Sequence, residues 1–292
     1  MSLPTIELHG HRGARGLWPE NTLPGFRGAL EIGVTAIEMD VALTGDGVVI
    51  LSHDPILDPL LTRGPDGAWI GTPGALIRDL SYAEAARFDV GRIRPGSPQQ
   101  AAFPQQAGSD GVPMPLLSDV AVLDPSIKLA VELKTFPDHP ERTVPPQEMA
   151  DAVLAVLEGA GALPRTRIIS FDWRPLRYLS GLRPGLALGY LTDAETVAAA
   201  RLWWGGPAPE DFGGSVVRAV AAEGGRIWGP DFQGLTEAAA AEARDFGVLV
   251  NPWTVNETAE MARLIGWGVG ALTTDYPDRA RAVMAEKGIV LA

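Results

Sequence analysis

Nine short runs of apolar and β-branched residues recur along the 292-residue chain, and most are followed by a stretch of helical period. The runs are residues 5–8, 36–41, 48–51, 128–133, 167–171, 186–191, 226–229, 248–252 and 270–273. Each run has the length of a strand. Because strands that alternate with helices pair in parallel, the pattern predicts an α/β protein built on a parallel sheet.

One run departs from this alternation. Residues 41 and 48 are joined by Ala-Leu-Thr-Gly-Asp-Gly, which indicates a tight turn at 45–47. Since a tight turn joins antiparallel strands, we expect residues 48–53 to form a hairpin with the second strand. Eight alternating strands then remain, which predicts a (β/α)₈ TIM-type barrel, with a doubly wound open sheet as the alternative.

Two helix starts have candidate caps. Asn256 precedes a stretch that places Met261 and Leu264 on one face. Asn21 or Thr22 precedes an earlier helix. Side chains of this kind accept the first free N–H groups of a helix, so we expect Asn256 and one of the earlier pair to be N-caps.

Residues 54–118 do not follow the alternation. They are rich in Pro and Gly, and one short helical stretch begins at Ser81. Long irregular segments in compact domains are usually lids or substrate loops. We therefore expect a single domain over residues 1–292, with an irregular insertion of about 54–118 after the second strand. It would cap the barrel face where such enzymes keep their chemistry.

Three carboxylates follow the strand alternation. Glu38 and Asp40 share one face of the second strand, and Glu132 occupies the same face of the run at 128–133. Adjacent buried anions are unfavourable unless a cation lies between them. The arrangement predicts a site for a divalent metal ion, Mg²⁺ or Ca²⁺. The alternative is a buried salt bridge between Glu132 and Lys134.

Two of the four histidines lie where strands end. His11 follows the first strand and His53 ends the hairpin, which places both on the barrel face that carries the carboxylates. Two imidazoles beside a metal suit general acid–base chemistry on a phosphoryl group. His9 shares a strand face with His11 and is expected behind the site, whereas His139 lies in a polar turn.

The chain is acidic, with 36 Asp+Glu against 24 Lys+Arg and a net charge of −12. Nucleic acid and anionic membranes are therefore unfavourable partners. An anionic substrate would need local positive charge, which Arg12 and Lys134 can supply; alternatively, they only balance the carboxylates. The absence of Cys excludes thiol catalysis and thiolate metal sites.

The N-terminal sequence MSLPTIELHG lacks a basic region followed by an apolar run, and no stretch approaches the ~18 apolar residues of a membrane span. We expect a cytoplasmic protein without stable membrane insertion.

Eight short motifs, in this order, resemble those of the glycerophosphodiester phosphodiesterase family. They are His-Arg-Gly (11–13), Pro-Glu-Asn-Thr (19–22), Glu-Met-Asp-Val (38–41), His-Asp (53–54), Glu-Leu-Lys (132–134), Ser-Phe-Asp (170–172), Trp-Thr-Val-Asn (253–256) and Thr-Asp-Tyr-Pro-Asp (274–278). The resemblance covers residues 6 to 280 and implies a TIM-type barrel with an insertion.

The resemblance also implies roles. The catalytic acid/base pair would be His11 and His53, the metal ligands Glu38, Asp40 and Glu132, and the phosphate ligands Arg12 and Lys134, with Trp253 as a substrate-side wall. The implied activity is metal-dependent hydrolysis of a glycerophosphodiester, a small-molecule substrate of lipid metabolism, to glycerol phosphate and an alcohol.

Two alternatives remain. The first is a phospholipase D-like activity on lysophospholipids, with an acyl chain admitted by the insertion residues Trp69, Ile70, Phe88 and Phe103. The second is a non-catalytic phosphodiester-binding barrel, which the presence of both histidines and all three carboxylates disfavours.

Overall fold

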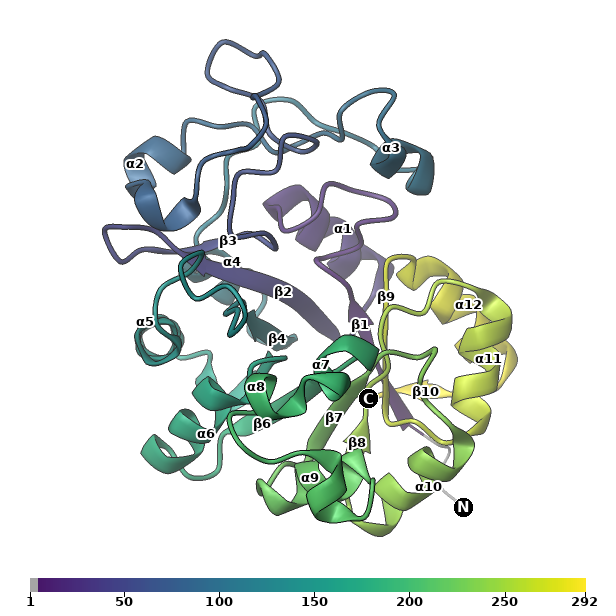
Figure 1. Ribbon diagram of the computed structural model, residues 1–292. Helices are drawn as coiled ribbons and strands as arrows, with labels where there is room; N and C mark the ends of the chain where they lie inside the picture. The colour runs from purple at the N-terminus through teal and green to yellow at the C-terminus, as the bar shows by residue number, and fades with distance from the viewer. Residues whose placement is uncertain (1–4) are drawn as a thin grey trace.

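A computed structural model describes residues 5–292 of the chain, so the first four residues of the N-terminal segment lie outside it (Figure 1). Its centre is a ring of parallel strands. In ring order they are β1 (Thr5–Gly10), β2 (Ala36–Leu43), β4 (Lys128–Leu133), β5 (Thr166–Ser170), β6 (Ala187–Thr192), β7 (Ile227–Pro230), β8 (Leu249–Val250) and β9 (Ala271–Thr274).

The ring closes at its last two strands. β9 pairs in parallel with β1, and the Gly270 N–H donates to the Val250 carbonyl at 3.0 Å, which joins β9 to β8. The Thr273 N–H donates to the Pro252 carbonyl at 3.1 Å. The predicted (β/α)₈ barrel is therefore confirmed, and an open sheet is excluded.

Helices surround the ring. They are α1 (Leu23–Ile32), α4 (Leu117–Ala121), α5 (Pro146–Gly159), α6 (Trp173–Leu182), α7 (Ala194–Ala198), α8 (Ala200–Trp203), α9 (Val216–Ala222), α10 (Glu237–Asp245), α11 (Thr258–Gly266) and α12 (Pro277–Glu286), with 3₁₀ turns η2 (Leu163–Arg165) and η3 (Pro209–Phe212). A short strand, β10 (Val290–Leu291), pairs with the start of β1. Within residues 5–292, none of the helices combines the length and apolar character needed to cross a membrane.

The helix caps follow the expectation at one site and depart from it at the other. Thr22 caps α1 by accepting the Gly25 N–H at 3.2 Å. Glu257, not Asn256, occupies the N-cap position of α11, and it makes no side-chain cap bond. The prediction for Asn256 was wrong because its side chain is used by the loop that follows β9.

Strand alternation divides the barrel into an apolar outer layer and a polar interior. Ile37, Met39 and Val41 point outward into the main hydrophobic core beneath the helices. Glu38 and Asp40 point inward. A parallel barrel normally fills its interior with branched apolar side chains, so a charged interior needs internal compensation.

Part of this compensation lies at the N-terminal end of the barrel. Glu7 accepts hydrogen bonds from His9 at 2.9 Å, Arg167 at 2.6 Å and Lys128 at 2.9 Å. Burial by itself would raise the pKa of Glu7, but the contacts with His9 and the charge of Arg167 lower it to about 2. We call these four residues, Glu7, His9, Lys128 and Arg167, the floor cluster, because they close the N-terminal end of the barrel.

The hairpin and the insertion lie on the opposite end. β3 (Val49–Leu51) pairs antiparallel with β2, as expected. Between β3 and α4 the chain is irregular apart from η1 (Ile77–Asp79), α2 (Tyr82–Ala85) and α3 (Pro98–Ala102), and it forms the blue region at the top of Figure 1. It has a small apolar core of its own, which includes Leu57 and Ile77.

The ionised Glu7 is expected to stabilise the fold in a pH-dependent way. Its pKa is lower in the folded chain (about 2) than in the unfolded chain (about 4.5), so its contribution is full above pH ~5 and fades as the pH falls toward 2. Glu7→Gln should cost about 3 kcal/mol at pH 7 and about 1 kcal/mol less at pH 3.5. Urea unfolding at both pH values measures this.

Glu286→Gln, at an exposed position on α12, is the control and should change the unfolding free energy little at either pH. A cost for Glu7→Gln that does not depend on pH would contradict the ionic account of the barrel floor.

Candidate active site

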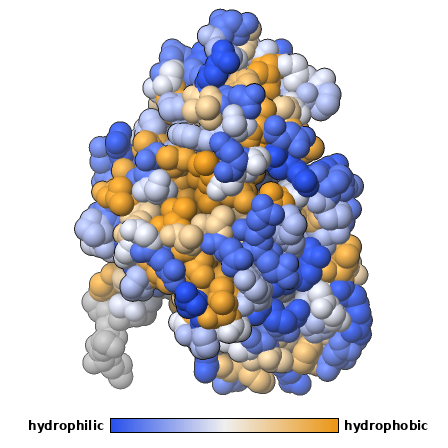
Figure 2. All heavy atoms as spheres, turned by 90° about the vertical axis from the view of Figure 1, so that its left-hand side faces the viewer, coloured by the Kyte–Doolittle hydropathy of each residue, from blue (hydrophilic) through white to orange (hydrophobic). Residues whose placement is uncertain are grey.

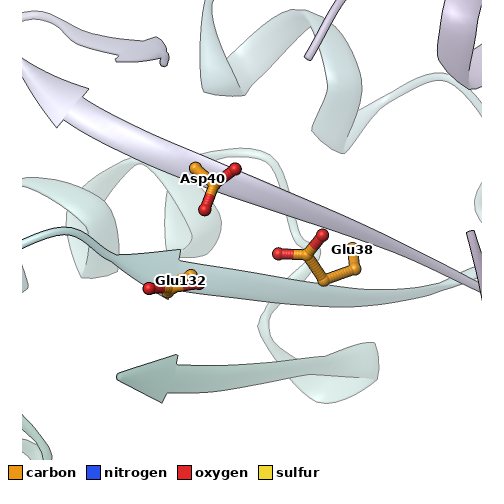
Figure 3. Close-up of side chains that lie close together, drawn as sticks. All are labelled: Glu38, Asp40 and Glu132. Carbon is orange, nitrogen blue, oxygen red and sulfur yellow. The ribbon is translucent and has the colours of Figure 1, made fainter. Parts of the chain in front are cut away.

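Three carboxylates converge at the catalytic end of the barrel. Glu38 and Asp40 project from β2 and Glu132 from the neighbouring β4, facing one space (Figure 3). Each offers an oxygen, and these oxygens all lie within 4.8 Å of one another. All three residues are buried, with Asp40 only 1% exposed. The parallel register opposite β4 places Asp40 directly beside Glu132.

The pKa values of the three carboxyl groups are shifted in different directions. Burial raises the pKa of Glu132 to about 7, although the ammonium of Lys134 opposes the rise. Burial, with the negative charge of Asp40, also raises the pKa of Glu38. For Asp40, burial is outweighed chiefly by the Arg12 guanidinium, which holds its pKa well below the usual range. Since burial makes Glu38 and Glu132 harder to ionise than in water, a bound cation would favour their ionised forms.

The donor set fits a hard divalent cation. The site offers carboxylate oxygens alone, the ligand type that Mg²⁺ and Ca²⁺ prefer. Asp40 Oδ1 is buried and has no hydrogen-bond partner among residues 5–292. Lys134 Nζ lies 3.7 Å from this oxygen, too far for a hydrogen bond, and a bound cation would satisfy the oxygen directly.

Two cationic side chains lie beside the carboxylates. Arg12 Nε lies 3.1 Å from Asp40 Oδ2, and Lys134 Nζ donates to Glu132 Oε1 at 2.7 Å. The salt bridge that the sequence left as an alternative is therefore present. This salt bridge does not balance all the negative charge of the site. The other cation, Arg12, is shared with Glu20, whose Oε1 lies 2.8 Å from Arg12 Nη1.

His11 is held by a residue from the far end of the chain. Its Nδ1 lies 2.6 Å from Asp275 Oδ1, and Nε2 makes no hydrogen bond within the described part of the chain. Asp275 also accepts hydrogen bonds from Arg15 at 2.8 Å and from Asn256 at 2.7 Å. Burial lowers the pKa of His11 to about 4, although Asp275 opposes this, so the ring is neutral at neutral pH.

His53 has a similar arrangement on the other side of the site. Its Nδ1 lies 2.8 Å from Asp54 Oδ1, and burial, together with the charges of Lys134 and Arg12, lowers its pKa. In both rings a carboxylate at Nδ1 favours the tautomer that leaves Nε2 as the acceptor. His53 is more exposed than His11, with side-chain exposures of 34% and 10%.

A cavity of about 130 Å³ joins these groups. Both histidines, Glu38, Glu132, Arg12 and Lys134 line its polar side. Phe171, Leu191 and Trp253 line the other side, where the Trp253 and Phe171 rings meet edge to face at 5.3 Å. We call this space the mouth cavity. Seen from the left of Figure 1, an apolar area occupies the middle of the face below the insertion (Figure 2).

The insertion contacts the loop that carries the basic residues. The Arg15 guanidinium lies 4.8 Å from the centre of the Phe103 ring, and Gln106 Nε2 donates to the Arg15 carbonyl at 2.6 Å. Arg15 in turn donates to Asp275, which bonds to His11, so the insertion is linked to His11 through these two residues.

Four residues of the site were missed by the sequence analysis. Asp275, Arg15 and Asn256 hold His11. Asn21 Nδ2 donates to Asp40 Oδ2 at 2.9 Å, and Asn21 Oδ1 accepts the Asp40 N–H at 3.2 Å. Asn21 has a positive φ of 51°, a conformation that Asn tolerates better than most residues. Their positions in the sequence could have identified these four residues, because each follows the C-terminal end of a strand or belongs to one of the quoted motifs.

The other two histidines do not line the mouth cavity. His9 is fully buried in the floor cluster with Glu7, consistent with its expected place behind the site. His139 is exposed and lies 3.4 Å from Glu141.

Comparisons with known proteins agree with one another. The model of the glycerophosphoryl diester phosphodiesterase family matches residues 11–279. A glycerophosphodiester phosphodiesterase of Bacillus subtilis (strain 168) is 30% identical over 278 residues, which cover 92% of this chain and 83% of the relative.

Solved structures share the fold. A structure described as a glycerophosphoryl diester phosphodiesterase from Silicibacter pomeroyi DSS-3 superimposes with a TM-score of 0.89 and 34% identity, covering 99% of this chain and 96% of that one. An Oleispira antarctica phosphodiesterase, in complex with the product sn-glycerol-3-phosphate, superimposes with a TM-score of 0.72 and 23% identity, covering 97% of each chain.

Mg²⁺ is expected to stabilise the protein through Glu38. A ligand at ~100 times its Kd adds about 2.7 kcal/mol, which corresponds to a rise in Tm of about 5 °C or more. Glu38→Gln should remove most of this rise. The pKa of Glu38 is raised in the folded chain, so ionising Glu38 at high pH destabilises the fold. Without metal at pH 8, the Glu38→Gln variant should therefore not have a lower Tm than the wild type.

Thermal denaturation with and without Mg²⁺ measures both effects. Glu148→Gln, at an exposed position of α5, is the control and should respond to Mg²⁺ like the wild type. An equal rise in Tm for Glu38→Gln would show that the cation binds elsewhere.

Proposed function

The chain belongs to the glycerophosphoryl diester phosphodiesterase family, and from this membership we propose that it hydrolyses glycerophosphodiesters to glycerol phosphate and an alcohol, using a divalent cation, Mg²⁺ or Ca²⁺. The observation that carries the proposal is the mouth cavity, where two of the three clustered carboxylates, three cationic side chains and two histidines converge. Glycerophosphodiesters are the polar part of phospholipids, so this activity belongs to lipid metabolism.

The substrate phosphate would bind in the mouth cavity, next to the carboxylates and the two cationic side chains that pair with them. A divalent cation held by Glu38, Asp40 and Glu132 supplies positive charge that polarises a phosphoryl oxygen. Arg12 can donate hydrogen bonds in a planar fork and Lys134 offers a compact charge, so together they would hold the remaining oxygens. Arg12 is held at the edge of the mouth cavity by its ion pairs with Asp40 at 3.1 Å and Glu20 at 2.8 Å.

His11 and His53 would transfer the protons. One ring removes the proton from the attacking hydroxyl group, and the other protonates the oxygen of the departing alcohol. Asp275 would act as a positioning residue for His11, because its bond to Nδ1 fixes the ring and leaves Nε2 as the acceptor. The lowered pKa of each ring favours the neutral form that the general base needs, whereas the ring that acts as general acid must first take up a proton at Nε2.

The apolar wall of the mouth cavity would contact the carbon atoms of the glycerol group. Trp253 is fixed there, because its Nε1 donates to the Gly229 carbonyl at 2.8 Å. The glycerol phosphate bound by the Oleispira antarctica protein is the product proposed here.

The same wall supports the second candidate, a phospholipase D-like activity on lysophospholipids, because Phe171 and Trp253 could also contact an acyl chain. The insertion gives this candidate less support. Ile70 and Phe88 pack on the insertion's own core, and Phe103 lies against Arg15.

The purified protein is expected to release glycerol phosphate from water-soluble glycerophosphodiesters with Mg²⁺ or Ca²⁺ and to lose this activity after the metal is removed by chelation. His11→Ala and His53→Ala should each lower kcat by ~100-fold or more, the usual contribution of a general acid or base. Asp275→Asn should lower kcat more than it raises KM, since it affects the orientation of His11.

His139→Ala, at an exposed histidine, is the matched control and should retain wild-type kcat. Full turnover after verified metal removal would contradict the cation's role. Faster hydrolysis of a lysophospholipid than of glycerophosphocholine would favour the second candidate. No turnover of either substrate would favour a non-catalytic phosphodiester-binding barrel.

A further inference from the structure

A second hollow, of about 40 Å³, lies between the insertion and the barrel and shares His53 with the mouth cavity. Glu20 comes from the loop after β1, whereas Asp54, Asp58 and Thr62 come from the chain after β3. We call this space the acidic hollow. Its contact with His53 means that a group bound there lies beside one of the two proposed proton-transfer residues.

The acidic hollow has negative charge that is only partly balanced. Of the described residues that line it, three are acidic and none is Lys or Arg. Glu20 is paired with Arg12. Asp58 accepts the Leu60 N–H at 2.7 Å, and no cationic side chain lies within ion-pair distance of it among residues 5–292.

Thr62 gives an independent indication that the hollow binds a polar group. The residue is only 1% exposed, and its hydroxyl has no hydrogen-bond partner in the part of the chain that the structure describes. Buried hydroxyl groups are nearly always hydrogen-bonded. The hydroxyl therefore offers a hydrogen bond to a polar group or a water bound in the hollow that Thr62 lines.

The two spaces differ in the charged side chains that line them. The mouth cavity holds Arg12, Arg15 and Lys134 beside its carboxylates, and these cations suit a phosphate, whereas the lining of the acidic hollow has no Lys or Arg and suits a cation. A phosphodiester whose alcohol carries a positive charge would match both spaces at once.

We propose that the acidic hollow binds the alcohol portion of the substrate, and that this alcohol is a small one carrying a primary ammonium group. The assignment rests on the proposed hydrolysis of glycerophosphodiesters. A primary ammonium has three donors, which can reach the Asp58 carboxylate and the Thr62 hydroxyl together. A quaternary ammonium has no donor for the Thr62 hydroxyl, and a neutral alcohol leaves Asp58 without a counter-charge.

Binding can be measured without turnover in the His11→Ala background. With Mg²⁺ present, isothermal titration calorimetry would compare glycerophosphoethanolamine, glycerophosphocholine and glycerophosphoglycerol. The ethanolamine compound should bind about tenfold more tightly than the glycerol compound, the scale of a hydrogen bond to a charged group. Asp58→Asn should abolish this ratio, and Thr62→Val should reduce it about threefold.

Asp66→Asn, at an exposed turn of the same insertion, is the matched control and should keep the ratio. An unchanged ratio in both Asp58→Asn and Thr62→Val would overturn the proposal, and so would equal binding of the choline and ethanolamine compounds. Thr62→Val tests the site if Asp58→Asn does not fold. Turnover of the three compounds by the wild type is measured separately and tests the proposed hydrolysis. The binding ratio tests the ammonium site even if no turnover is found.

Discussion

The burial of three carboxylates inside a closed barrel is the constraint on which the rest of the site depends. Glu38, Asp40 and Glu132 are largely removed from water, so each needs a charge or a hydrogen bond from the protein or from a bound cation. Arg12 and Lys134 supply part of the compensation. The remainder produces the raised pKa values that make cation binding favourable.

Barrel closure determines how the proton-transfer groups are held. β1 and β9 are neighbours in the ring although they lie at opposite ends of the chain, and this brings Asp275 to His11. His53 instead takes its carboxylate, Asp54, from the next residue. One histidine is therefore fixed by the closed ring and the other by the hairpin and the insertion. The insertion therefore contacts the surroundings of both histidines, because Phe103 and Gln106 also lie against Arg15, which bonds to Asp275 beside His11.

Much of this could be predicted because strand alternation is local. The faces of Glu38, Asp40 and Glu132 follow from their positions in apolar strands, and the tight turn at 45–47 predicts the antiparallel hairpin. The contacts of Asp275 and Asn21 could not be predicted, because they depend on where loops meet after closure. Asn256 shows the conflict directly: its sequence context favours a helix cap, but the bond to Asp275 takes its side chain.

Diffraction from crystals of the protein soaked with Mn²⁺ would test the central claim most directly, because the anomalous signal locates the ion without reference to activity. The account predicts one strong peak at about 2.0–2.4 Å from carboxylate oxygens of Glu38, Asp40 and Glu132, the usual range for such cations. A site left empty at saturating Mn²⁺, with Lys134 still bonded to Glu132, would show that the carboxylates are balanced by the protein alone and would contradict the account.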